Sequence, residues 1–438
     1  MRFDTLHLWY LGEPSSPRPV GTLRLVESGK GVSLRYGSDW LAHGFPLSED
    51  LPLVDVEHLP RARLAAGAPM AAGAVDDARP DRWGERVIQY VDRPKRLSLM
   101  EYLYYAGDDR FGALGVSSSE TEYLPRPGGP LPRLAQAQAL AEVVHKVAAK
   151  EALTELERGV LTAGGSFGGA KPKALIEIGR RQWVIKFFNN EPIDTPLVEH
   201  ATMTLARKAG IDVAETKVVA LLGEHAIAVR RFDRDGERRI HSLSAGTALR
   251  AAAPAGQEPE LGYPALAQLL RRAGVAQDGE NELDSRELFR RMVFNILLDN
   301  TDDHEKNHAL LVIDPTRHGR FRLAPAYDVL PSNSGQGQQE FVCGNEGRAS
   351  TLSNAMSQCR LFGLAAADAA AEVQRVIEVV NGWRAHFRSC GVTPADIESL
   401  ADYIDGEALR SQRESFSVRA HAATPARKTR RRGPFGPG

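Results

Sequence analysis

Residues 300–308 concentrate side chains that can carry out chemistry. The stretch reads Asn-Thr-Asp-Asp-His-Glu-Lys-Asn-His, and Asp328 follows further along the chain. Asp302 and Asn307 have the D-x-x-x-x-N spacing of a loop that transfers phosphoryl groups, in which the acid accepts the proton of the substrate hydroxyl and the amide holds Mg²⁺. A hairpin and then a lone acid, here Asp328, is the order in which such sites carry their second metal ligand. The pattern favours phosphoryl transfer.

The same stretch contains a competing metal motif. His304, Glu305 and His308 spell H-E-x-x-H, in which two histidines on one helical face bind zinc and the glutamate is a general base. That geometry needs residues 304–308 on a helix, whereas residues 309–313 (ALLVI) read as a strand that begins at once. We therefore prefer phosphoryl transfer. Bound zinc, with activity lost in Glu305→Ala but kept in Asp302→Ala, would reverse this choice.

A glycine-rich loop and two strands precede the motif and could supply the phosphate site. Residues 164–169 include four glycines, and glycine lets backbone N–H groups approach an anion closely. Strand-like runs follow at 174–178 and 182–187, and Lys186 stands inside the second. A lone lysine in a strand is more often a solvated residue at a sheet edge. In this order, however, it matches the phosphate lysine of a kinase N-lobe.

A predicted helix after residue 194 offers Lys186 a partner. Thr195 suits the N-cap, and Pro196 suits the first helical position. Glu199 then lies on the apolar face of the helix, so it can point partly inward, where a charge needs a partner. We expect Glu199 to pair with Lys186. A second apolar helix, at 285–299, delivers the chemical stretch itself.

The composition bounds the class of protein. The chain has 438 residues, of which 42% are hydrophobic and 25% charged, as in globular proteins. Its net charge of −1 argues against a protein that coats nucleic acid over its whole surface. Three widely spaced cysteines without a C-x-x-C pair suit a reducing compartment. No apolar run is long enough to span a bilayer, so we expect a cytoplasmic protein without a membrane partner.

The organisation can be read from shifts in composition. Residues 3–36 alternate as β-strands with a hairpin, and residues 76–84 read as a surface loop leading into a helix near 82–92. Residues 117–133 are rich in Ser, Pro and Gly and read as a linker. Helices are expected at 365–387 and 394–412. The predicted units are a β-rich N-terminal subdomain (1–125), an N-lobe (134–235), a helical C-lobe (236–420) and a basic disordered tail (421–438).

With these parts assembled, the sequence resembles the HipA family of bacterial toxin kinases, over most of its length. The resemblance rests first on the T-D-x-H-x-K-N motif at 301–307 followed by Tyr327-Asp328. It extends to Pro80-Asp81-Arg82-Trp83-Gly84, Lys186 and residues 229–234. It implies an α+β, protein-kinase-like bilobal fold with a β-rich N-terminal subdomain and a mainly helical C-terminal lobe.

The resemblance also implies a function, that of an ATP- and Mg²⁺-dependent serine/threonine protein kinase acting as the toxin of a type II toxin–antitoxin system. Asp302 would be the catalytic base, and Asn307 and Asp328 would hold Mg²⁺. Ser166 stands where family members carry a serine whose autophosphorylation shuts the kinase off. The residues implied in nucleotide binding are Gly168, Gly169, Ala170, Lys171, Lys173, Lys186, Arg230, Arg231, Phe232, His304, Lys306, Asn307 and Asp328.

The implied partners are a helix-turn-helix antitoxin of the HipB type, a protein substrate, and DNA only through the antitoxin. Arg230 stands where a hinge acid is common, a departure that bears on nucleotide contacts, and residues 241–244 (HSLS) replace the usual acidic stretch on the substrate side. Residues 327–363 resemble a divergent branch of the family, so the protein target is not implied. Two other functions stay open. A small-molecule phosphotransferase would share most of the site, and a catalytically silent scaffold would need only the antitoxin on DNA.

Overall fold

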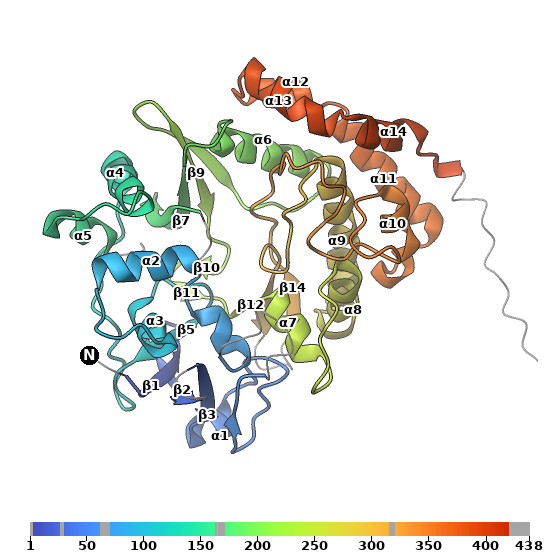
Figure 1. Cartoon of the computed structure of the whole chain (residues 1–438). Helices are drawn as coiled ribbons and strands as arrows, with labels where there is room; N and C mark the ends of the chain where they lie inside the picture. Colours follow the sequence, from blue (N-terminus) through green and yellow to red (C-terminus); the bar gives the residue numbers. More distant parts are fainter. Residues whose placement is uncertain are drawn as a thin grey trace, which may run out of the picture.

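The computed structural model describes residues 3–26, 30–61, 71–162, 164, 171–314 and 320–419. The predicted loop residues Ser166, Gly168, Gly169 and Ala170, and the predicted tail, lie outside these ranges. Figure 1 shows the N-terminal strands at the lower left, a second small sheet above them, and the helical C-terminal region on the right. Within the described ranges, none of the helices combines the length and the apolar character needed to cross a bilayer.

The N-terminal region is built on a five-stranded sheet in the order β4-β3-β2-β1-β5, with every neighbouring pair antiparallel. Its elements are β1 (Thr5–Tyr10), β2 (Arg18–Val26), β3 (Gly31–Tyr36), α1 (Ser38–His43), β4 (Glu57–His58), the 3-10 helix η2 (Gly73–Ala78), α2 (Arg82–Val91), α3 (Leu99–Tyr105) and β5 (Leu114–Ser117). The predicted hairpin is confirmed, because β2 and β3 pair from Gly21 opposite Tyr36 to Val26 opposite Gly31.

A four-stranded antiparallel sheet, β6-β7-β9-β8, forms the second region. Its elements are η3 (Leu134–Gln136), α4 (Ala137–Ala148), α5 (Glu155–Leu161), β6 (Lys173–Ile178), β7 (Arg181–Phe187), α6 (Thr195–Lys208), β8 (Thr216–Ala220) and β9 (His225–Arg230). Both predicted strands are confirmed. Lys173 and Lys186 lie directly opposite each other on β6 and β7, so their side chains share one face of the sheet.

The predicted start of α6 is one residue late. Asp194, not Thr195, is the N-cap, and its carboxylate accepts a hydrogen bond from the Leu197 N–H at 3.2 Å. Both residue types are good N-caps, and the sequence pattern alone did not distinguish them. The predicted inward position of Glu199 is correct, because its side chain is almost fully buried.

The C-terminal region consists of helices, a three-stranded sheet, β12-β13-β14, and a two-stranded sheet, β10-β11. Its elements are β10 (Arg234–Asp235), β11 (Arg238–Arg239), β12 (Ser242–Ser244), α7 (Ala245–Ala252), α8 (Tyr263–Ala273), η4 (Gln277–Gly279), α9 (Glu280–Leu297), β13 (Ala309–Asp314), β14 (Arg320–Leu323), α10 (Leu352–Ser357), η5 (Cys359–Phe362), α11 (Ala366–Val380), α12 (Trp383–Ser389), α13 (Pro394–Ile404) and α14 (Glu407–Ser415). The buried helix α9 carries Leu288, Met292 and Ile296 into the core with no exposed surface.

Three details of this region differ from the sequence prediction. The single helix expected at 365–387 is broken into α11 and α12 at Asn381 and Gly382, and the one expected at 394–412 into α13 and α14 at Asp405 and Gly406. Asn, Asp and Gly are poor helix formers. Helix α7 and strand β12 were not predicted. Ser244 caps α7 by accepting the Thr247 N–H at 3.1 Å. The sequence did not indicate this helix start, because the stretch around it is short and its hydrophobic periodicity is weak.

Hydrophobic packing crosses the predicted linker. Trp83 and Val87 of α2 pack in one core cluster with Leu140 of α4 and with Ile176 and Trp183 of the second sheet. In Figure 1, α2 accordingly lies next to α4 and α5. The N-terminal region is therefore joined to the second region by a shared core as well as by the chain.

Candidate active site

A cavity of about 1010 Å³ lies where the three regions meet. Its lining combines side chains of the N-terminal region, of β6 and β7, of the segment after β9, and of the loop between α9 and β13. All the predicted site residues that the structure describes line it: Lys171, Lys173, Lys186, Arg230, Arg231, Phe232, Asp302, His304, Lys306, Asn307 and Asp328. The structure therefore gathers into one cavity residues that are far apart in the sequence.

Lys186 lies at the centre of this arrangement. Its ammonium nitrogen is 2.6 Å from a carboxylate oxygen of Glu199 on α6 and 2.6 Å from one of Asp328. The predicted pair of Lys186 and Glu199 is confirmed. Asp328 has a φ of 57°, a left-handed conformation that Asp tolerates better than most residues. This conformation marks the turn from which Asp328 reaches Lys186.

The charges of this group are mutually stabilised. Burial opposes the charged form of Lys186, but Asp328 and Glu199 raise its pKa above the ordinary value. Burial works in the same way against Asp328, yet Lys186 and Lys173 hold the pKa of its carboxyl well below the ordinary value. For Glu199, burial dominates and raises the pKa. The Lys186–Asp328 pair is therefore charged at neutral pH.

The loop of residues 298–308 presents Asp302 to the cavity. The hydroxyl oxygen of Ser332 accepts the N–H groups of Thr301 and Asp302 at 2.9 and 3.0 Å. Asn307 reaches back to the Asp302 carbonyl oxygen at 3.4 Å. Burial raises the pKa of the Asp302 carboxyl, partly offset by His304. Within the described part of the chain, the Asp302 carboxylate has no hydrogen-bond or ion-pair partner. A carboxylate of this kind on a fixed backbone suits a group that must accept a proton from a bound partner.

The zinc motif is not supported by the geometry. Residues 304–308 form a turn and not a helix, so the two histidines do not share a helical face. His308 is buried, and its Nε2 lies 2.7 Å from the Asp303 carboxylate, which also accepts the Tyr263 hydroxyl. Asp303 was not singled out from the sequence. Its burial makes it the internal support of the loop, a role that only the tertiary contacts reveal.

The oxygen ligands in the cavity suit magnesium better than zinc. Among the described residues, no three His, Cys, Asp or Glu side chains are grouped so as to hold a metal ion. The Asp328 carboxylate and the Asn307 amide both line the cavity. Mg²⁺ is usually bound by one or two protein oxygens, with substrate phosphates and waters completing its shell. The predicted pair of ligands therefore fits this ion.

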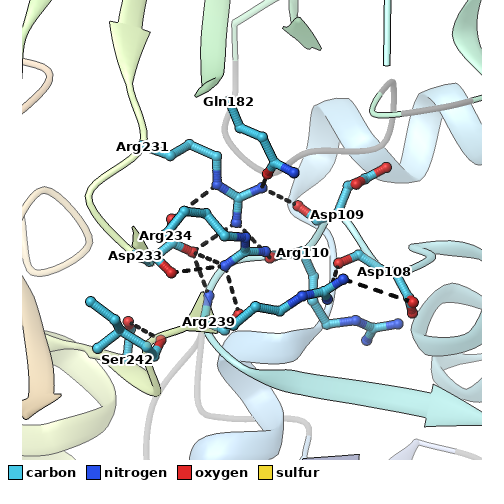
Figure 2. A network of polar contacts seen from close by, with 11 residues as sticks. Asp108, Asp109, Arg110, Gln182, Arg231, Asp233, Arg234, Arg239 and Ser242 are labelled. Carbon is cyan, nitrogen blue, oxygen red and sulfur yellow. Dashed lines mark hydrogen bonds and ion pairs between the residues drawn. The ribbon is translucent and has the colours of Figure 1, made fainter. Parts of the chain in front are cut away.

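The segment after β9 is locked by a buried polar network (Figure 2). Asp233 accepts both Arg231 at 2.7 Å and Arg234 at 2.9 Å, and Arg231 and Arg234 also bond to the Arg110 carbonyl oxygen. Burial opposes the charge on Asp233, but the two arginines hold the pKa of its carboxyl well below the ordinary value. The network ties the N-terminal region to the segment that connects the second sheet to the C-terminal region.

The same network limits how residues 230–232 can meet a ligand. The Arg230 N–H is bonded to the Glu215 carbonyl at 2.8 Å, and the Arg231 N–H to the Gln182 carbonyl at 3.0 Å. The Arg231 side chain is almost fully buried. A nucleobase in the cavity would therefore meet the remaining backbone atoms of this segment and the ring of Phe232. The centroid of this ring lies 5.3 Å from that of Tyr327, with the two planes tilted by 35°.

Residues 76, 77 and 79–82 also line the cavity, and the sequence interpretation of this segment needs correction. The predicted helix exists as α2, but the preceding loop is not a plain surface loop. Asp77 accepts the Ser244 N–H at 2.7 Å and the Thr247 hydroxyl at 2.9 Å. Asp81 forms an ion pair with Lys306. The density of charge before a tryptophan was the signal available in the sequence.

Comparisons with known proteins bear on these observations. A model described as the HipA-like C-terminal domain matches residues 165–383, and one described as the HipA N-terminal domain matches residues 15–117. A Haemophilus influenzae protein named "Putative kinase" is 31% identical over 144 residues, and "Putative kinase Y4dM" of Sinorhizobium fredii is 31% identical over 160 residues. These matches span 30% and 34% of this chain, and only 40% and 37% of the relatives.

A solved structure resembles the chain over nearly its whole length. It is described as the Shewanella oneidensis MR-1 toxin–antitoxin system HipA, HipB and its operator DNA complex, and the matched chain is 17% identical with a TM-score of 0.65. The likeness covers 96% of this chain and 100% of that one. At 17% identity this likeness is evidence for the fold alone, and it confirms the predicted α+β class.

Proposed function

This chain belongs to the HipA family, and from that premise we propose that it is a serine/threonine protein kinase that transfers the γ-phosphoryl group of ATP. One observation carries the proposal. Lys186 bridges Glu199 and Asp328 at 2.6 Å each, in the same cavity as Asp302 and Asn307. A phosphate lysine held by a helix glutamate, a base and two oxygen ligands are the parts that phosphoryl transfer needs.

Each residue has a defined part in the proposed reaction. Asp302 accepts the proton of the substrate hydroxyl, and its raised pKa brings it closer to the working pH, where a general base is most effective. Lys186 contacts the phosphates with a charged amine whose position two carboxylates fix. Asn307 and Asp328 would hold Mg²⁺, which supplies positive charge for the phosphates. Positioning and charge account for most of the catalysis.

The test is phosphoryl transfer from radiolabelled ATP in a cell lysate. Wild-type protein is expected to label protein bands, and Asp302→Asn is expected to reduce labelling by about 10²–10⁴-fold, the typical contribution of a general base. Phosphoamino-acid analysis should give phosphoserine or phosphothreonine. Label in a small molecule alone would replace the proposal with a small-molecule phosphotransferase, and no label at all would favour a silent scaffold.

We extend the proposal to regulation at Ser166, which lies outside the described residues. Ser166→Ala should give an enzyme that keeps its activity after preincubation with ATP, whereas the wild type loses activity. A phosphopeptide map of the preincubated wild type without phosphorylated Ser166 would contradict this switch.

The biological role we propose is that of a toxin neutralised by a helix-turn-helix antitoxin of the HipB type, with DNA bound only through that antitoxin. The family membership supports this role, and so does the likeness to the Shewanella HipA chain, which was solved together with HipB and operator DNA. Growth arrest on expression, relieved by an adjacent helix-turn-helix gene, tests it.

We also propose that the chain is divided into four units, residues 1–125, 134–235, 236–420 and 421–438. Limited proteolysis that cuts first between 125 and 134 would support the first boundary.

A further inference from the structure

Asp81 occupies the N-cap position of α2 but does not cap the helix. Its backbone is extended, and no helical N–H is bonded to its side chain. Aspartate is among the best N-caps because its carboxylate satisfies free N–H groups of the first turn. A residue that forgoes this local interaction is usually engaged elsewhere, at a site where function overrides the local preference.

The Asp81 carboxylate is engaged with the loop that carries Asp302. It forms an ion pair with the ammonium of Lys306, the residue before the proposed metal ligand Asn307. The backbone of Lys306 is already fixed, because its N–H donates to His304 Nδ1 at 3.1 Å and its carbonyl accepts the Tyr327 hydroxyl at 2.6 Å. Only the direction of its long side chain remains free, and Asp81 determines it.

The start of α2 is itself held from two sides. The Trp83 indole N–H, buried, donates to the Lys173 carbonyl of β6 at 2.6 Å. Asp77, just before it in the chain, bonds to Ser244 and Thr247 at the start of α7. Asp81 therefore projects from a segment anchored both to the second sheet and to the C-terminal region.

Stability does not explain this ion pair. The side chains of Lys306 and Asp81 are 45% and 33% exposed, and ion pairs at such sites contribute little to folding because water and salt screen them. Both residues line the cavity that holds Lys186, Asp302 and Asp328. The position of the pair thus points to a role in the cavity.

We propose that Asp81 is a positioning residue, which holds the Lys306 ammonium at the wall of the cavity where the γ-phosphate of a nucleoside triphosphate reacts. The inference rests on the proposed kinase function. It makes the N-terminal region a working part of the active site, since it supplies the carboxylate that orients a cation of the catalytic loop.

The main test uses Asp81→Asn, Lys306→Met and the double variant. Asparagine is also a good N-cap, so Asp81→Asn removes the charge without weakening the start of α2. We expect kcat for ATP turnover to fall by about tenfold, as for a misplaced catalytic cation, with the melting temperature and the affinity for Mg²⁺·ADP nearly unchanged. The double variant should be no slower than Lys306→Met, and Asp81→Glu should recover part of the rate.

Asp55→Asn is the matched control, because Asp55 is an exposed carboxylate of the same region that pairs with Arg35 at 3.0 Å and is not among the residues that line the cavity. It should retain the wild-type rate. A wild-type or faster rate in Asp81→Asn, or effects of the two single variants that multiply in the double variant, would overturn the proposal.

A second readout does not depend on kinase activity. The rate at which acetic anhydride modifies Lys306, followed by mass spectrometry, should rise severalfold in Asp81→Asn and stay unchanged in Asp55→Asn. An unchanged rate in Asp81→Asn would refute the ion pair. If wild-type protein and Asp302→Asn are equally inactive while Lys306 becomes more reactive in Asp81→Asn, the proposed kinase function fails and the contact itself stands.

Discussion

Two carboxylates of the molecule, Asp328 and Asp233, each lie beside cationic side chains, yet their surroundings differ. Asp233 is 1% exposed and receives bonds from Arg231, Arg234 and the Gly112 N–H. Asp328 is 35% exposed, and within the described part of the chain only its Oδ1 is bonded, to Lys186. A carboxylate with all its hydrogen-bonding capacity used fixes the structure, whereas one with capacity left over can take a ligand.

The largest effect that would test this contrast is on ligand binding. Asp328→Ala is expected to abolish Mg²⁺-dependent ATP binding and to reduce turnover by about 10³-fold or more, since a preorganised charge is lost from the cavity. Titration calorimetry with ATP in the presence and absence of Mg²⁺ measures it. Unchanged nucleotide affinity would contradict the metal role of Asp328.

The counterpart change at Asp233 should act on the fold. Asp233→Ala leaves two buried arginines without their carboxylate, so the free energy of unfolding should fall by about 3–5 kcal/mol. Urea denaturation followed by circular dichroism measures it, with Asp55→Ala expected to stay within about 0.5 kcal/mol of the wild type. A loss below about 1 kcal/mol would show that the network is not a lock.

A smaller effect is expected at Glu199. In Glu199→Gln, Lys186 keeps Asp328 but loses its second carboxylate, so kcat should fall by about tenfold through a less well-aligned amine. The melting temperature should change little, because glutamine preserves the shape and one hydrogen bond. Steady-state rates at saturating ATP measure it, and a wild-type kcat would argue that Asp328 alone aligns Lys186.

The pH dependence should separate the catalytic role proposed for Asp302 from the structural role of Asp233 in a single experiment. Burial raises the pKa of Asp302, so activity should be lost as pH falls through a value above about 3.9, the ordinary pKa of Asp. The pKa of Asp233 is lowered, so its contribution to stability is complete above that ordinary value and is lost only in stronger acid. The expected result is an acidic range in which the protein is folded but inactive. Loss of activity and of circular dichroism at the same pH would contradict it.

Much of this site followed from residue types and spacing. The D-x-x-x-x-N spacing, the strand after residue 308 and the position of Lys186 within β7 depend on local pattern, and the structure bears out both strands. The pairing of Lys186 with Glu199 could be predicted because helical periodicity places Glu199 on the apolar face of its helix. A buried carboxylate there needs an opposite charge within reach.

The contacts of the N-terminal region could not be predicted in the same way. Asp81 and Lys306 are 225 residues apart, and nothing in either local sequence specifies the other. Asp233 likewise looks like an ordinary turn residue until Arg110 and Gly112 are brought against it. Local chemistry indicates which residues need partners, while the choice among distant partners depends on how the three regions pack.

The position of Lys173 opposite Lys186 has a consequence for the enthalpy of nucleotide binding and for the protons taken up with it. Burial, and then the charge of Lys186, lower the pKa of Lys173, whereas the pKa of Lys186 is raised. Lys186 is therefore already charged, and a polyanion arriving at this face of the sheet would favour the charged form of Lys173. We expect nucleotide binding to draw protons from solution, so that its apparent enthalpy varies with the ionisation heat of the buffer, and more so at alkaline pH.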